Sequence, residues 1–169
     1  MWGTDATRVW TPFGYPWIFI AIDHCSGECI GVHASLSGHR FAALVPLQDG
    51  VREHFGDLEA GVASGLKIRH DHGSQYMSEA FQAELSFLGA ESSPSFVASP
   101  QGNGIAERFI RTLKEQLLWV VSTTSLEELQ QALQRFRKNY NEHWLLERHG
   151  HITPSEVRRR LKPSSGKAA

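Results

Sequence analysis

The sequence predicts a single α/β domain in which helices cover a mixed five-stranded sheet. Segments typical of strands come first, and helical and strand patterns alternate after them. The chain has 169 residues, of which 41% are hydrophobic and 21% charged, and no repeat or linker divides it. This size and composition are typical of one globular domain that buries its own core.

The first three strands are expected near the N-terminus. The segment WGTDAT, which contains Asp5, is short and extended in character. It is followed by WIFIAIDHCSGECIGVHAS, two runs of aromatic and β-branched residues on either side of Ser26 and Gly27. Serine and glycine favour turns, so these two runs predict an antiparallel hairpin.

The middle of the chain alternates helix and strand. From Gly38 to about Glu59 the apolar spacing indicates a helix that is broken near Pro46. A short strand, Leu66–His70, gives way at Asp71 to a polar loop, and strand ends of this kind are where α/β sheets place ligands. We expect Ser78 to cap a helix that runs to about Leu88, followed by a brief strand near Ser93 to Val97.

Helices dominate the C-terminal half. We expect the loop Ala98–Gly104, which contains proline and glycine, to be mobile, and helices to follow at Ile105–Val121 and at about Leu126–Tyr140. Thr153-Pro154-Ser155-Glu156 has the form of a capping box at the start of another helix. The predicted domain covers residues 1–162, and residues 163–169 are expected to form a disordered tail.

The helix Ile105–Val121 carries two different faces. At 100° per residue, Glu107, Arg111 and Lys114 share one side. The opposite side is an apolar stripe, predicted to be buried, of Phe109, Ile110, Leu113, Leu117 and Val120. By itself the charged side would be interpreted as a solvated helix face.

The spacing of the acidic residues changes that interpretation. Thirty-five residues separate Asp71 from Glu107, and Asp5 lies upstream in a strand. The motifs HDHGSQY, SPQGNGIAERFIRTLKEQL and WGTDAT, with NYNEHW and a later Thr153-Pro154, resemble those of the DDE superfamily. This superfamily contains the catalytic cores of retroviral integrases and bacterial insertion-sequence transposases, and the resemblance extends from Trp2 to about Leu161.

The resemblance implies an RNase H-like fold and a metal-dependent polynucleotidyl transferase that cleaves DNA and transfers strands in transposition. It implies that Asp5, Asp71 and Glu107 are catalytic and bind two Mg²⁺ or Mn²⁺ ions, hard ions that prefer oxygen ligands. The expected DNA contacts come from residues on the Glu107 face and in the two neighbouring loops: Lys114, Arg111, Gln101, Asn103 and His72.

Several residues have competing interpretations. Asp23 also ends an apolar strand and could replace Asp5 as the first carboxylate, although a turn-capping role is its simpler explanation. His70 could take part in the chemistry or merely flank Asp71. The run Arg158-Arg159-Arg160, with Lys162, could grip DNA or form a solvated helix end.

Composition narrows the functional classes. Cys25 and Cys29 are too few for a disulfide framework or a zinc site and are expected to pack. The formal net charge of -1 does not indicate DNA binding. Binding of DNA would therefore depend on local basic patches or on further domains. We expect a cytoplasmic bacterial protein without a membrane segment, acting on transposon ends and target DNA as a homodimer or higher multimer. An inactive DNA-binding or dimerising remnant and an RNase H-like nuclease are the alternatives.

Overall fold

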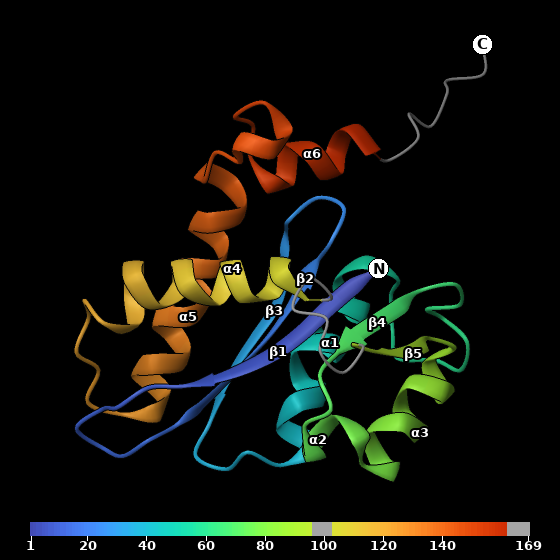
Figure 1. Ribbon diagram of the computed structural model, residues 1–169, viewed down its shortest axis with the longest axis horizontal. Helices are drawn as coiled ribbons and strands as arrows, with labels where there is room; N and C mark the ends of the chain where they lie inside the picture. Colours follow the sequence, from blue (N-terminus) through green and yellow to red (C-terminus); the bar gives the residue numbers. More distant parts are fainter. Residues whose placement is uncertain (96–102, 162–169) are drawn as a thin grey trace.

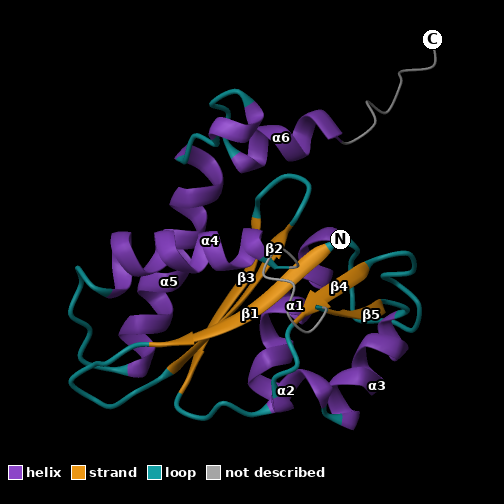
Figure 2. Ribbon diagram, in the orientation of Figure 1, coloured by secondary structure: helices purple, strands orange, loops and turns teal. Residues whose placement is uncertain are grey.

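The computed structural model describes residues 1–95 and 103–161, which form a mixed five-stranded sheet in the order β3-β2-β1-β4-β5 (Figures 1 and 2). Its strands are β1 (Trp2–Arg8), β2 (Trp17–Asp23), β3 (Cys29–Ser35), β4 (Lys67–His70) and β5 (Glu91–Pro94). The first three pair antiparallel, whereas β4 pairs parallel with both β1 and β5. The predicted hairpin and mixed sheet are confirmed.

Helices cover both faces of the sheet (Figure 2). On one face lie α1 (Arg40–His54), α2 (Ser74–Met77) and α3 (Glu79–Leu88). On the other lie α4 (Gly104–Leu113), the π-helical turn η1 (Lys114–Leu118) and α5 (Leu126–His143), and the chain continues through η2 (Glu147–His149) to α6 (Pro154–Leu161).

Strand β2 divides the core between these two layers because successive side chains of a strand point to opposite faces. Phe19 and Ala21 belong to the cluster under α1 and α3, whereas Ile18, Ile20 and Ile22 belong to the cluster under α4 and α5. All five side chains are almost completely buried. The central strands therefore form a rigid platform from which β1 and β4 present their ends.

Helix α1 contradicts the predicted break at Pro46. Pro46 is buried inside a continuous helix, and a Cβ atom on Gly31 would stand 2.2 Å from its carbonyl oxygen. Glycine in β3 thus allows the helix backbone to approach the sheet closely. This packing compensates for the hydrogen bond that proline cannot donate.

The helix predicted at Ile105–Val121 changes character at Lys114. A π-helical turn follows α4, and it rotates the later side chains away from α-helical phase. Phe109, Ile110 and Leu113 are buried as expected, but Val120 is 70% exposed and Leu118, only 8% exposed, packs in its place. The prediction that Val120 belongs to the buried stripe was wrong for this reason.

Other boundaries differ from expectation by a few residues: α1 ends at His54 instead of near Glu59, and β5 is Glu91–Pro94 instead of lying near Ser93 to Val97. Ser78 caps α3, and the Glu156 amide donates to Thr153 Oγ1 over 3.3 Å at the start of α6. Helix α5 continues three residues past Tyr140, to His143. The predicted mobile loop and disordered tail fall largely or wholly outside the described residues. Within the described part, no helix is long and apolar enough to cross a membrane.

Candidate active site

Asp5 lies in the middle of β1, on the side of the sheet that α4 covers. It pairs with Ile20, whose side chain belongs to the core cluster under α4 and α5, and paired residues share a face. Its carboxylate accepts a hydrogen bond of 2.7 Å from the Ala6 amide and is only partly exposed. The strand therefore holds a charged group at the edge of an apolar layer.

Asp71 follows β4, the strand parallel to β1 and hydrogen-bonded to it. It is exposed, and its Oδ1 accepts a hydrogen bond of 2.7 Å from the Gly73 amide. Its neighbour His70 is completely buried, with its ring stacked on Tyr76 and its Nε2 2.9 Å from Ser92 Oγ. Burial lowers the pKa of His70, and its contacts indicate that it packs beneath the loop.

Glu107 lies exposed in the first turn of α4, and Asn103 anchors that turn to β1. The Asn103 amide nitrogen donates to the Thr4 carbonyl over 3.1 Å, and the side chain is buried. A Cβ on Gly3 would stand 2.6 Å from Asn103 Oδ1, so glycine at this position allows the close approach. Tertiary packing thus brings Glu107 toward Asp5.

Asp71 and Glu107 are close enough to Asp5 to affect its pKa. The pKa of Asp5 is raised to about 6, mainly by burial and further by the negative charges of Asp71 and Glu107. The Ala6 hydrogen bond and the positive charge of Lys114 oppose this rise. Asp71, Glu107 and Lys114 therefore lie near the partly buried Asp5 carboxylate in the middle of β1.

The three carboxylates are chemically suited to bind a divalent ion, although their side chains are not arranged around a common point. Among residues 1–95 and 103–161, no three histidine, cysteine, aspartate or glutamate side chains form a group that could hold a metal ion. Asp71 instead bonds to its own loop, as expected where like charges repel. Asp5 and the two carboxylates that raise its pKa nevertheless offer the hard oxygen ligands that Mg²⁺ and Mn²⁺ prefer.

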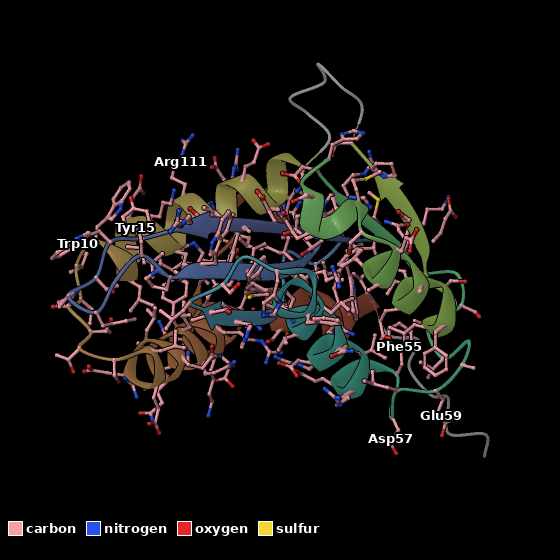
Figure 3. All side chains as sticks on the ribbon, turned by 90° about the horizontal axis from the view of Figure 1, so that it is seen from below. Trp10, Tyr15, Phe55, Asp57, Glu59 and Arg111 are labelled. Atoms are coloured by element: carbon pink, nitrogen blue, oxygen red, sulfur yellow. The ribbon has the colours of Figure 1, made fainter. Side chains whose placement is uncertain are left out.

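The residues predicted to contact DNA occupy different settings. Arg111 is exposed on α4 and points into solvent (Figure 3), His72 is exposed beside Asp71, and Lys114 is half-buried where the π-helical turn begins. Asn103 is buried against β1, and Gln101 lies outside the described residues. Their contacts with DNA stay predictions.

The competing residues have structural partners. Asp23 caps the β2–β3 turn by accepting hydrogen bonds from the Cys25 amide and the Ser26 hydroxyl, which matches the simpler expectation. Arg159 and Arg160 both pair with Glu156. Of the two cysteines, both free thiols, Cys29 packs as predicted but Cys25 is exposed, because it lies in the turn rather than in a strand.

Sequence reasoning missed a group of arginines beside the start of α4. Arg69, Arg108 and Arg148 line one pocket of about 890 Å³. They come from β4, α4 and η2, which are far apart in the sequence. No motif connects them, so only the fold could reveal the group.

Comparisons with known proteins agree with this architecture. A family model described as an integrase core domain matches residues 88–154. The chain is 28% identical over 166 residues to the transposase for insertion sequence element IS629 of Shigella sonnei, covering 98% of this chain and 54% of that protein. It is 30% identical over 143 residues to the transposase for IS904 of Lactococcus lactis, covering 83% and 53%.

The fold also resembles solved structures. The catalytic core domain of the HTLV-2 integrase, in a structure with magnesium, superimposes with a TM-score of 0.67 at 17% identity, covering 92% of this chain and 93% of that one. This likeness confirms the RNase H-like fold. The chain spans about half the length of the transposases that it matches.

Proposed function

We propose that this chain, an integrase core domain related to those of insertion-sequence transposases, cleaves DNA strands and joins them to target DNA during transposition. One observation carries this proposal. The partly buried Asp5 carboxylate lies within the electrostatic reach of Asp71 and Glu107, which come from separate elements. A fold does not need to collect like charges for stability, so the grouping indicates chemistry.

Each residue has a distinct role in this proposal. Asp5, Asp71 and Glu107 would hold Mg²⁺ or Mn²⁺, and bound divalent ions would supply an activated nucleophile and stabilise the leaving oxygen. Arg111 and Lys114, on the Glu107 face, would bind phosphates and position the strand. Asn103 would keep α4 at a fixed distance from β1 through its bond to the Thr4 carbonyl.

The partners and setting of the reaction belong to the same proposal. The substrates would be transposon ends and target DNA, and the chain would act in the bacterial cytoplasm as a homodimer or higher multimer. The bacterial transposases among its relatives support this setting. The HTLV-2 integrase core, in structures with magnesium described as trimeric and dimeric forms, supports the metal and the multimer.

The proposal is tested by incubating the protein and Mn²⁺ with a branched DNA that mimics a strand-transfer product, and with an RNA–DNA hybrid of matched sequence. We expect DNA cleavage and joining, and a loss of at least about a hundredfold for Glu107→Gln, equivalent to about 2.7 kcal/mol of transition-state stabilisation. Glu115→Gln, at an exposed position after α4, is the matched control and should retain wild-type activity.

Three outcomes contradict the proposal. Cleavage of the hybrid alone would indicate an RNase H-like nuclease. Binding of the branched DNA without any cleavage would indicate an inactive remnant. Equal activity of the Glu107→Gln and Glu115→Gln proteins would remove Glu107 from the reaction.

A further inference from the structure

Beside the candidate active site lies a second feature, the arginine pocket, defined by Arg69, Arg108 and Arg148. Its volume is about 890 Å³, and its walls come from the first turns of α4, the end of β4, the β2–β3 turn and the segment before α6. These segments meet around the first turn of α4, near the N-terminus of the chain (Figure 1). Arg69 is two residues from Asp71, and Arg108 follows Glu107 directly.

The positive charge of this pocket is not neutralised within the chain. All 18 acidic residues lie in the described part of the chain, yet none pairs with Arg69, Arg108 or Arg148 there. Glu147 is the one acidic residue in the lining. The pocket therefore carries a net positive charge in a protein whose formal net charge is -1.

One nitrogen atom of the lining arginines is buried without a partner. Arg69 Nε is inaccessible to solvent and makes no hydrogen bond to the described residues. A buried donor without a partner destabilises the fold, and more so when it is charged. An unpaired buried donor is understandable at a binding site, where a bound ligand can supply the missing hydrogen bond. The donor is then already in position before the ligand arrives.

Gly27, in the lining of the pocket, leaves room for the Arg148 side chain. A Cβ on Gly27 would stand 2.9 Å from Arg148 Nη2 and 2.7 Å from Leu146. The backbone of Gly27 has φ of +75°, a conformation that other residues rarely adopt. The β2–β3 turn is thus shaped so that the Arg148 guanidinium can lie over it.

We propose that the arginine pocket binds backbone phosphates of the DNA strand held at the carboxylates, as a second contact region distinct from Arg111 and Lys114; this inference rests on the proposed function. Guanidinium groups match phosphate oxygens in geometry and stay charged at all relevant pH values. The start of α4 adds the positive end of a helix dipole and free amide groups. The pocket volume is ample for more than one phosphate, which favours a strand over a single anion.

Salt-dependent binding of duplex DNA in EDTA tests this inference without any cleavage. Each lost phosphate contact should lower the slope of log Kd against log salt by about 0.9. We therefore expect a loss of about 0.9 for Arg108→Gln and for Arg148→Gln, and about twice that for the double variant. Arg108→Lys retains the charge and should recover most of the affinity.

Arg135→Gln provides the matched control, since Arg135 is exposed on α5 and forms no ion pair within the described structure. Its slope should equal that of the wild type. Thermal scans should show that the Arg108 and Arg148 variants melt no lower than the wild type, because they remove like charges that repel.

Two results would overturn the inference. Unchanged slopes for both pocket variants, or an equal loss for Arg135→Gln, would exclude DNA from the pocket. Stabilisation by inorganic phosphate that depends on Arg108 and Arg148, with no change in the DNA slopes, would assign the pocket to free anions instead. The salt slopes are measured on DNA that is not cleaved, because EDTA removes divalent ions. Unchanged slopes would therefore contradict the role of the pocket alone, whereas absent cleavage with Mn²⁺ would contradict the proposed function.

Discussion

Glu28 and Asp5 are both acidic residues on inner strands or turns, and burial raises the pKa of each, yet their surroundings are opposite. Glu28 pairs with Arg158 Nη1 at 2.9 Å, and that positive charge lowers its pKa against the effect of burial. Asp5 has Asp71 and Glu107 as neighbours, which raise its pKa further. This protein therefore neutralises buried charge where the charge only supports the fold, and places like charges together where we propose chemistry.

The arginines divide in the same way. Arg158 reaches across to Glu28, and Arg137 bonds both to Glu53 and to the Cys29 carbonyl. Arg108 and Arg148 have no carboxylate partner within the described chain although they share a pocket. The basic run Arg158–Arg160 is conspicuous in the sequence, and each of its arginines pairs with a carboxylate. The dispersed arginines of the pocket have no such partner within the described chain.

The largest expected effect comes from breaking the neutralised pair. Arg158→Met should lower the free energy of unfolding by about 3 kcal/mol, because Glu28 is then buried without its counter-charge. For a domain of this size that corresponds to a melting point roughly 6 to 12 °C lower. Calorimetry checks this value.

Arg159→Met is the control for this change. Arg159 is exposed and pairs with Glu156 on the same helix, so its loss should cost under about 1 kcal/mol. If both variants melt within 2 °C of each other, within about 1 kcal/mol, the distinction between a supporting charge and a solvated one fails.

Local sequence signals predicted most of the fold, because they act within a few residues. Ser78 and Thr153 cap the helices that they were expected to cap, and the hairpin turn follows from Ser26 and Gly27. The continuous helix at Pro46 was missed because its cause, Gly31, lies in another element. Local spacing likewise cannot reveal the π-helical turn at Lys114, which rotated Val120 out of the core.

Part of the candidate site was predictable because its carboxylates lie in short sequence motifs. Asp5, Asp71 and Glu107 could be proposed from the motifs. In the fold, the pairing of β1 with β4 brings Asp71 toward Asp5, and the Asn103 bond to the Thr4 carbonyl brings Glu107 toward it. The arginine pocket could not be proposed, because arginines at three distant positions carry no common pattern until β4, α4 and η2 come together.

A second, smaller effect concerns the pH dependence that Asp5 confers in the absence of metal. Its pKa is near 6 in the folded protein and 3.8 by reference, so the folded state binds the proton more tightly. The contribution of protonated Asp5 to the free energy of unfolding is therefore fully present below about pH 4. It is lost as the pH rises through about 6. The loss should be on the order of 2 kcal/mol, given the partial exposure of the group.

Asp5→Asn removes this titration. Its melting point relative to that of the wild type should rise by roughly 4 to 8 °C between pH 4 and pH 7 in EDTA. Asp57→Asn, at a fully exposed loop position (Figure 3), should show no such trend. A pH-independent difference between the Asp5→Asn and wild-type proteins would show that the surroundings of Asp5 do not favour its protonated form.

The smallest effect tests whether the grouped charges are matched to a metal ion. Mn²⁺ that binds only the folded state stabilises it by RT ln(1 + [L]/Kd), about 1.4 kcal/mol at ten times Kd, or roughly 3 to 5 °C in melting point. Asp71→Asn removes one negative charge near Asp5, so it should melt slightly higher than the wild type without metal and lose most of the shift with Mn²⁺. Asp23→Asn should melt lower without metal, because Asp23 caps the β2–β3 turn, but should keep the full shift. The assignment of the three carboxylates would be wrong if Asp23→Asn lost the response to Mn²⁺ while Asp71→Asn retained it, since the like-charged group around Asp5 would then have no part in binding the ion.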